Sequence, residues 1–371
     1  DVRMNSEIKN ISIFGGIIIS AVVFLGIIFV GLDDLSLQNQ GSTTGVFLNI
    51  NDSGVKKAPE LVGIEHYLNT TPEKLEQEME NKVVLYDIWT YSCINCIRTL
   101  PFITSWDEKY SDEGLLIIGI HSPEFEFEKD PSNVQDAIEK YEINYPVVMD
   151  NKMETWKAFE NNYWPRKYIA DHEGNLRYDH IGEGAYEETE KIIQQLLDER
   201  AQSMGIKTVS NKELVNIEEF EHTPFRTPEL YFGYKFAQNR NNLGSNEGFQ
   251  PEKIVTYTEP KKIELNKFYP VGDWKNHSDS MELTKSNGSI KMYFEAKEVN
   301  IVTNSYAEIE IFLDGIPLNE KNTGKDISLN GKLIVSDPGM YNIIDSENSI
   351  SGILEMDIQG KGFQAFTFTF G

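Results

Sequence analysis

The two cysteines of this 371-residue chain, Cys93 and Cys96, are the residues best suited to do chemistry. Cysteines at this spacing serve as zinc ligands, as haem attachment points or as a redox pair. A zinc ribbon needs a second pair of ligands, and haem attachment needs a histidine after the second cysteine, where this chain has Ile97. A purely structural disulfide across so short a loop would contribute only about 2 kcal/mol. The spacing therefore favours thiol-disulfide exchange, with no metal and no cofactor beyond the Cys93–Cys96 disulfide.

The residues around the pair predict a strand that ends just before Cys93 and a helix that begins just after it. Residues 83–89 (VVLYDIW) are a β-rich run, and residues 94–110 have helical spacing. The free N–H groups and the dipole at a helix N-terminus favour a thiolate at Cys93, and the thiolate is the attacking species in disulfide exchange. Cys96, one turn later on the same side, is placed to resolve a mixed disulfide.

Strands and helices alternate from residue 58 to residue 204, which is typical of an α/β layer fold. The remaining elements expected there are a buried strand at 115–121, a helix at 134–141, a short strand at 146–149, a hairpin from 167–170 and 176–181, and a closing helix at 187–200. The closing helix would turn Ile192, Ile193, Leu196 and Leu197 inward. A strand, a Cys-x-x-Cys helix, a hairpin and a last helix follow the order of the thioredoxin fold.

The stretch VVLYDIWTYSCINCIRTLPFI resembles the thioredoxin superfamily, and more closely its TlpA/ResA-like extracytoplasmic branch. It is most similar to the soluble C-terminal part of the DipZ proteins, which have the same Trp-Thr-Tyr-Ser lead into Cys-Ile-Asn-Cys. Residues 121–138 and 161–184 also resemble the DipZ pattern. The resemblance implies a thiol-disulfide oxidoreductase that acts on extracytoplasmic protein disulfides. DipZ proteins also have a multi-helix membrane domain, so a separate membrane electron donor is expected here.

The resemblance also implies roles for residues near the pair. Asp87 corresponds to the buried carboxylate that takes the proton of the resolving cysteine, and Trp89 to the motif tryptophan, expected to bind substrate. Trp164-Pro165 corresponds to the cis-proline site that holds the substrate polypeptide. Each residue has a structural alternative: a solvated carboxylate for Asp87, core packing for Trp89 and a trans loop proline for Pro165. None of the six histidines is assigned a catalytic role.

An apolar segment without charged residues occupies positions 11–32 and, as a helix, would extend about 30 Å, the thickness of a bilayer core. Arg3 and Lys9 precede it, and acidic residues follow it, so residues 1–10 are expected in the cytoplasm and the rest outside. A cleaved signal peptide is the alternative, but its apolar core is usually shorter. We therefore expect a single-pass transmembrane anchor, followed by a polar tether at 33–57.

A linker is expected at 205–226, followed by an all-β domain at 227–371. Its expected strands are 289–295, 298–303, 307–313 and 363–370, separated by turns such as Asp314-Gly315. The pattern predicts a jelly-roll-like β-sandwich. Its first residues (TPELYFGY) and its last (FTFTFG) resemble the C-terminal module of DipZ proteins, which looks like a carbohydrate-binding sandwich. Tyr269, Trp274 and Tyr306 are candidates for stacking on a sugar, or for the core.

The net charge of the chain and the charges beside the cysteines bear on its partners and on the direction of its reaction. The chain has 59 acidic and 34 basic residues, a formal charge of −25, which disfavours a nucleic-acid partner. Between the cysteines, Ile94 and Asn95 add no positive charge, which favours a reductase or isomerase over an oxidase. The alternative is a surface binding protein whose β-sandwich binds carbohydrate or protein, with the cysteine pair as a redox or copper sensor.

Overall fold

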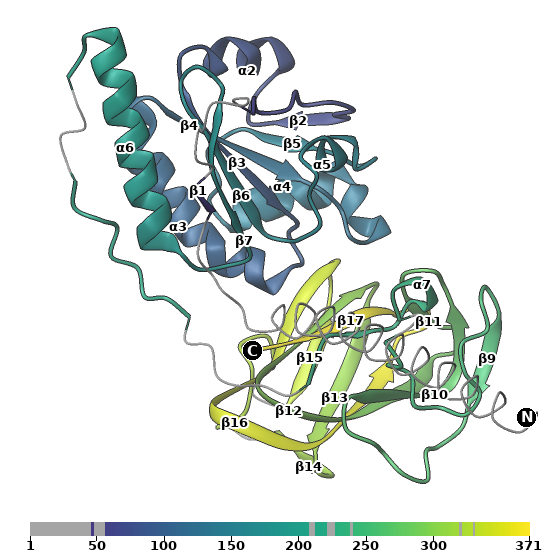
Figure 1. Ribbon diagram of the computed structural model, residues 1–371. Helices are drawn as coiled ribbons and strands as arrows, with labels where there is room; N and C mark the ends of the chain where they lie inside the picture. Colours follow the sequence, from purple (N-terminus) through teal and green to yellow (C-terminus); the bar gives the residue numbers. More distant parts are fainter. Residues whose placement is uncertain are drawn as a thin grey trace, which may run out of the picture. The chain divides into compact units, whose positions relative to one another are not determined.

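The computed structural model describes residues 46–47, 56–207, 212–220, 227–237, 240–318, 321–328 and 331–371 (Figure 1). The predicted cytoplasmic N-terminus and anchor, residues 1–32, lie outside these described residues. Within the described ranges, no helix is both long and apolar enough to cross a bilayer. Residues 45–371 form one packed unit, which contains two separate sheets.

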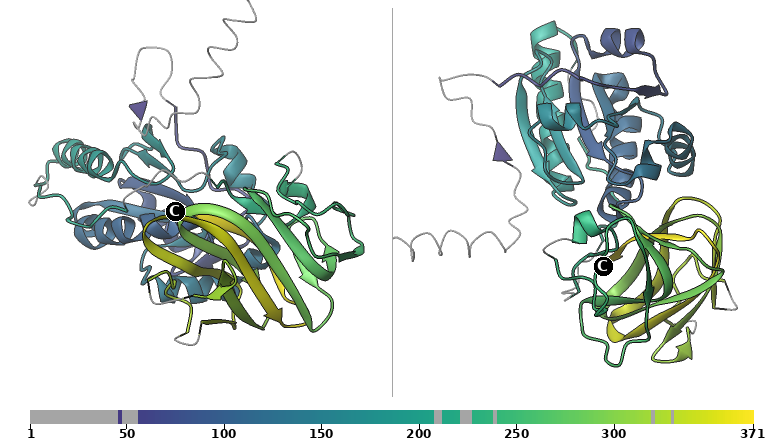
Figure 2. Two further views of the ribbon diagram at one scale, coloured as in Figure 1. Left: turned by 90° about the horizontal axis from the view of Figure 1, so that it is seen from below. Right: turned by 90° about the vertical axis from the view of Figure 1, so that its right-hand side faces the viewer.

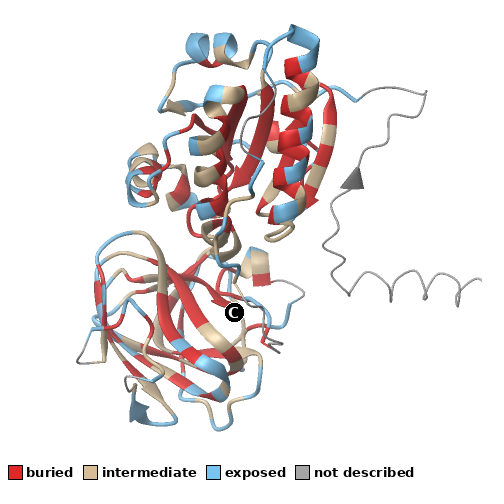
Figure 3. Cartoon of the chain, turned by 90° about the vertical axis from the view of Figure 1, so that its left-hand side faces the viewer, coloured by how far each residue is buried: buried red, intermediate tan, exposed pale blue. Residues whose placement is uncertain are grey.

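The first sheet has seven strands in the order β1-β7-β6-β3-β4-β5-β2. The strands are β1 (Val46–Phe47), β2 (His66–Leu68), β3 (Val83–Trp89), β4 (Leu115–His121), β5 (Val147–Met149), β6 (Arg166–Ala170) and β7 (Leu176–Ile181). The central strand β3 runs parallel to β4 and antiparallel to β6. Every residue of β3 and β4 is buried (Figure 3), as the continuous apolar run at 115–121 predicts for β4. The edge strand β1 lies inside the predicted tether, so that segment is not wholly a free spacer.

Helices cover both faces of this sheet (Figure 2). They are α2 (Pro72–Met79), α3 (Ile94–Tyr110), α4 (Pro131–Lys140), α5 (Glu154–Ala158) and α6 (Tyr186–Met204), with short 3₁₀ turns at Ser111–Glu113 and Glu126–Lys129. The face made by Val83, Leu85 and Trp89 packs against α3, α4 and α6. The opposite face packs against α2 and α5. Because side chains alternate along a strand, Asp87 belongs to the face that α3 covers.

The predicted elements of this region are confirmed with small shifts at their ends. Strands β3, β4 and β7 and helix α3 have the predicted bounds. Helix α4 begins three residues earlier than predicted, because the Asp130 side chain caps it and Pro131 occupies its first turn. Helix α6 continues to Met204, where Gly205 adopts a left-handed conformation with φ of 66° and ends it. Helices α2 and α5 and strand β2 have no counterpart in the prediction.

The second sheet holds ten strands in the order β14-β13-β16-β12-β10-β11-β17-β8, with β15 on β13 and β9 on β10. The strands are β8 (Leu230–Tyr231), β9 (Ile254–Tyr257), β10 (Lys267–Asn276), β11 (Met281–Leu283), β12 (Asn287–Asn304), β13 (Ala307–Leu313), β14 (Ile316–Pro317), β15 (Lys332–Val335), β16 (Gly339–Gln359) and β17 (Gln364–Phe370), and a short helix α7 spans Tyr234–Ala237. The first half of β12 pairs with β10 and its second half with β17, so the sheet folds back on itself. The region is β-rich as predicted, and its likeness to a jelly-roll sandwich stays a prediction.

One strand prediction in this region is wrong. The expected strands 289–295 and 298–303 are a single strand, β12. Its pairing with β16 shifts register between Ala296 and Glu298 and again between Val299 and Asn300. Such a bulge bends a strand without ending it. The polar residues at the bulge resemble a turn in the sequence.

Residues 212–220, which lie within the predicted linker, pack along α3 and α6. The buried Glu190 side chain accepts hydrogen bonds from the Val215 N–H (2.9 Å), the Tyr110 hydroxyl (2.6 Å) and Lys109 Nζ (2.9 Å). Val215 and Ile217 pack against the core beneath. A buried carboxylate needs donors, and this segment supplies one, so residues 212–220 form a strap along the helices.

Candidate redox site

Cys93 is the N-cap of α3, with φ of −83° and ψ of 118°. Its Sγ accepts a hydrogen bond from the Cys96 N–H at 3.4 Å. Both cysteines are free thiols; Cys93 is half-buried, whereas Cys96 is only 1% exposed. A sulfur at this position receives the N–H groups and the positive end of the helix dipole, which stabilise a thiolate. Cys93 is therefore placed to meet a partner, and Cys96 is shielded behind it.

The Cys96 thiol cannot lose its proton easily. Burial, together with the adjacent Cys93, raises its pKa well above the usual range. Asp87 on β3 interacts electrostatically with Cys96 and is itself 1% exposed. Burial raises the pKa of Asp87 to about 7, opposed by the positive charge of Lys167. Among the described residues, Asp87 Oδ1 has no hydrogen-bond partner. The solvated-carboxylate alternative for Asp87 is therefore wrong.

Lys167 is a buried cation that the sequence analysis missed. It lies directly opposite Asp87 in the β3–β6 pairing and is 0% exposed. Its Nζ donates to the Gly182 carbonyl at 3.3 Å and lies 5.3 Å from the centre of the Tyr186 ring. Burial lowers the pKa of Lys167 to about 8, opposed by Asp87 and Cys96. The sequence does contain a sign of this buried cation: Lys167 occupies an inward-facing position of an apolar strand, two residues after Pro165.

The three predicted substrate-binding residues have different surroundings. Trp89 is 0% exposed and packs edge-on against His121, with ring centres 5.4 Å apart. A fully buried indole cannot contact a polypeptide, so the expected substrate contact is corrected to a packing role. Trp164 is half-buried and donates from Nε1 to the Ser122 carbonyl at 2.9 Å. The Trp164–Pro165 peptide is cis, as the resemblance implies, and the trans alternative is wrong.

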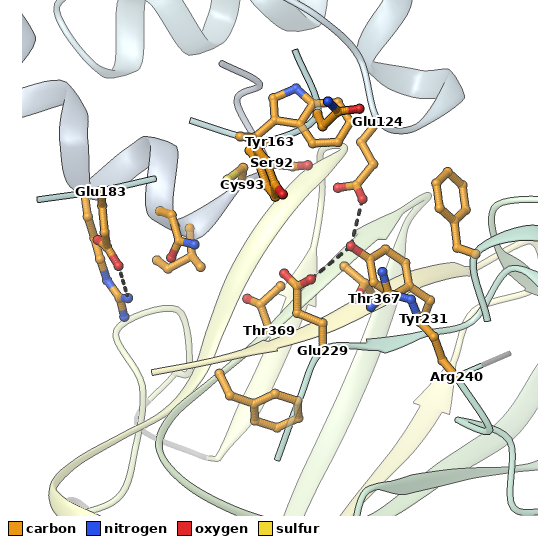
Figure 4. Close-up of a pocket in the computed structure, with 17 residues that line it drawn as sticks. Ser92, Cys93, Glu124, Tyr163, Glu183, Glu229, Tyr231, Arg240, Thr367 and Thr369 are labelled. Atoms are coloured by element: carbon orange, nitrogen blue, oxygen red, sulfur yellow. Dashed lines mark hydrogen bonds and ion pairs between the residues drawn. The ribbon is translucent and has the colours of Figure 1, made fainter. Parts of the chain in front are cut away.

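Cys93 opens into a cavity of about 600 Å³ whose walls come from both sheet regions (Figure 4). The first region contributes Ser92, Glu124, Tyr163, Trp164 and Glu183, among others. The C-terminal region contributes Glu229, Tyr231, Phe236, Arg240, Thr367 and Thr369. Trp164 thus shares the cavity with Cys93, and Tyr163, 52% exposed, lies beside it. The cavity's second wall was not predicted, although Glu229, Tyr231, Thr367 and Thr369 fall within the two end stretches that resemble DipZ proteins.

The second wall is fixed by direct contacts between the two regions. Phe125 and Phe127 pack against Phe366 of β17, with ring centres 5.1 and 4.7 Å apart. Arg98 of α3 pairs with Glu298 of β12 at 2.5 Å. The cavity is therefore a product of the fold of residues 45–371, and neither region forms it alone.

Glu128 anchors the loop that carries Cys93. It is 0% exposed, and its Oε1 accepts from the Ser92 hydroxyl at 2.5 Å. Its Oε2 accepts from the backbone N–H groups of Glu124 and Phe125, at 2.6 and 2.9 Å. Burial raises the pKa of Glu128. One buried side chain therefore holds both the residue before Cys93 and the backbone of Glu124.

No metal site accompanies these residues in the described ranges, where no group of three or more His, Cys, Asp or Glu side chains could hold an ion.

Known proteins share both regions. Residues 55–197 match the Redoxin family, and residues 227–371 match the family described as a thioredoxin-like C-terminal domain. Protein DipZ of Mycobacterium bovis is 32% identical over 318 residues, which are 85% of this chain and 43% of that protein. The chain thus spans less than half the length of this relative.

Two further matches cover the first region. The thiol-disulfide oxidoreductase YkuV of Bacillus subtilis is 30% identical over 141 residues, which are 38% of this chain and 94% of YkuV. A solved thioredoxin-like protein in the oxidized form is 30% identical and covers 39% of this chain and 96% of its own, with a TM-score of 0.36. The match to YkuV, which covers nearly all of that protein, shows that the chain belongs to the thioredoxin-like family of thiol-disulfide oxidoreductases, with a Redoxin domain followed by a thioredoxin-like C-terminal domain.

Proposed function

We propose that the chain exchanges disulfides with extracytoplasmic proteins through Cys93 and Cys96, and that it works as a reductase or isomerase. One observation carries the proposal. A half-buried cysteine at a helix N-cap opens into a cavity, and a fully buried cysteine lies one turn behind it. This is the arrangement that a nucleophile and its resolving partner require.

The proposed reaction has two exchange steps. The Cys93 thiolate attacks one sulfur of a substrate disulfide, the S–S bond breaks, and a mixed disulfide forms. Cys96 then passes its proton to Asp87 and attacks Cys93 Sγ, which releases the second substrate sulfur. The products are a reduced substrate and a Cys93–Cys96 disulfide, so a membrane electron donor must return two electrons and two protons.

The charges around Cys93 support the reducing direction. Ile94 and Asn95 carry no charge. Arg98 also lines the cavity, but its guanidinium is paired with Glu298 at 2.5 Å and Glu183 at 3.6 Å. A strongly oxidising pair needs a thiolate stabilised by nearby positive charge in addition to the helix N-terminus. The charge of Arg98 is shared with these two carboxylates, and Arg240, a second cation that lines the cavity, lies 4.6 Å from the centre of the Tyr231 ring. Trp164, Pro165 and the exposed ring of Tyr163 would hold an extended polypeptide beside Cys93.

The proposal places both regions outside the cell membrane, with a thioredoxin-like domain at 58–204 and a β-sandwich at 227–371. The apolar run at 11–32 supports a single-pass anchor with residues 1–10 in the cytoplasm.

We do not extend the proposal to carbohydrate. Trp274 and Tyr269, two of the three candidates for sugar stacking, are 0% and 3% exposed and belong to the core. Tyr306 is 59% exposed, but neither of the other two can join it in a stacking platform. Of the two alternatives given for these residues, the core alternative is confirmed for Trp274 and Tyr269.

Reduction of an insulin disulfide by the full-length chain in detergent, with dithiothreitol as the electron source, tests the proposed function. We expect Cys93→Ser to lower the catalysed rate to that of dithiothreitol alone. Glu126→Gln is the matched control, since Glu126 is exposed and paired with Lys129 on the surface. A Cys93→Ser protein that reduces insulin as fast as the wild type would contradict the proposal.

A further inference from the structure

The Tyr231 hydroxyl lies between two carboxyl groups in the cavity beside Cys93 (Figure 4). Its oxygen is 2.8 Å from Glu124 Oε1 and 3.0 Å from Glu229 Oε2. A phenol has one hydrogen and can donate to only one acceptor. The second contact becomes a full hydrogen bond of its own when the other carboxyl group carries a proton and donates a hydrogen bond to the phenol oxygen. The two short contacts, together with the raised pKa values of both carboxyl groups, favour a cluster that holds one carboxyl proton in addition to the phenol hydrogen.

The surroundings of the cluster keep the carboxyl proton bound near neutral pH. Burial, helped by the nearby carboxylates of Glu229 and Glu128, raises the pKa of Glu124 to about 8. The Tyr231 hydrogen bond and Arg240 act in the opposite direction. The guanidinium of Arg240 lies 4.6 Å from the centre of the Tyr231 ring. Two adjacent ionised carboxylates would repel each other, and sharing one proton relieves that repulsion.

The cluster is held in a fixed relation to the reactive cysteine. Glu128 binds the Ser92 hydroxyl and the Glu124 N–H at the same time, and Ser92 precedes Cys93 in the chain. Tyr231 and Glu229 come from the other wall of the cavity, on and just before β8. Glu229 is exposed as a residue, although burial around its carboxyl group raises the pKa of that group; it is the member of the cluster through which we expect solvent to return a proton.

We propose that Glu124, Tyr231 and Glu229 act together as the acid that protonates the sulfur leaving a substrate disulfide. This step rests on the proposed function. As the Cys93 thiolate forms its bond to one substrate sulfur, the other sulfur departs with the electron pair of the broken S–S bond. It then takes the shared proton and leaves as a thiol, and the cluster is left with two carboxylates and a neutral phenol. Water reprotonates the cluster through Glu229. The C-terminal region thus supplies part of the reaction site.

Two uncharged disulfides distinguish this role from a structural one. Bis(2-hydroxyethyl) disulfide releases a basic alkyl thiolate that benefits from a proton, whereas 4,4′-dipyridyl disulfide releases a stabilised thiolate that leaves readily without one. Because neither probe is charged at neutral pH, removing a carboxylate does not change their attraction to the cavity. Rates are measured on the full-length chain in a Cys96→Ser background, which isolates attack by Cys93.

The decisive variant is Glu124→Gln. Its amide can donate to Tyr231 as the protonated carboxyl does, so the hydrogen bonds remain while the transferable proton is lost. We expect the rate with the alkyl disulfide to fall by about tenfold or more, in line with general acid catalysis, and the rate with the dipyridyl disulfide to stay unchanged. Tyr231→Phe should show the same split, and the surface variant Glu126→Gln should leave both rates unchanged.

Equal slowing with both probes would show a packing effect and overturn the inference, as would no slowing with either. Both outcomes leave the proposed function standing. If Cys93→Ser, in the same background, still reacted with the two probes at the parent rate, the proposed function itself would fail.

Discussion

Replacing Cys96 with serine is expected to leave the chain covalently attached to an oxidised polypeptide through Cys93. Cys96 is buried directly behind Cys93 and attacks within the same molecule. Well-placed intramolecular groups reach effective concentrations on the order of 10⁵ M, far above that of any free thiol. The lifetime of the mixed disulfide should therefore rise by several orders of magnitude in the variant. Non-reducing electrophoresis after an acid quench measures the adduct.

The matching variant, Cys93→Ser, should give no adduct, because the remaining Cys96 is shielded and its pKa is raised by burial. Peptide mapping of the trapped species should find the substrate sulfur on Cys93. An adduct on Cys96, or an equally abundant adduct in Cys93→Ser, would reverse the roles assigned to the two cysteines.

Replacing Asp87 with asparagine is expected to slow the second exchange step by about 10²-fold at pH 7, the usual loss when a positioned base is removed. Only the ionised carboxylate can accept the Cys96 proton. Because the pKa of Asp87 is raised to about 7, the wild-type rate should fall as the pH drops below that value. The charged and titratable groups that act on Asp87 or respond to it are Lys167, Cys96 and Tyr145.

The asparagine variant should lack the inflection near pH 7 and should recover at high pH, where hydroxide deprotonates Cys96. Rapid quench of a preformed mixed disulfide measures this step alone. Asp112→Asn, an exposed acid just after α3, is the matched control. An unchanged pH profile in Asp87→Asn would mean that another group takes the proton.

Local signals were enough to predict the elements that carry the cysteines. The apolar run of β3 and the helical spacing of α3 define their bounds without any tertiary information, so both were predicted to the residue. The inward orientation of Asp87 followed from its place among apolar strand residues. Strand β12 was split in two because its bulge looks like a turn when only one strand is seen.

The contacts that could not be predicted join residues far apart in the sequence. Lys167 meets Asp87 only through the register of β6 on β3. Tyr231 reaches Glu124 across 107 positions of the chain, and no local pattern indicates that contact. The type of an aromatic residue does not reveal its exposure, so buried Trp89 and Trp274 and exposed Tyr163 could not be told apart.

The reduction potential of the Cys93–Cys96 pair in the full-length chain tests the central claim most directly. The protein is equilibrated with glutathione buffers in detergent, its thiols are trapped, and the fraction of disulfide is determined by mass spectrometry. We predict a reversible disulfide between the two cysteines with a potential near about −270 mV, where thioredoxin lies. A potential near about −120 mV would identify an oxidant instead of a reductase or isomerase. The absence of a Cys93–Cys96 disulfide at every glutathione ratio would contradict the account altogether.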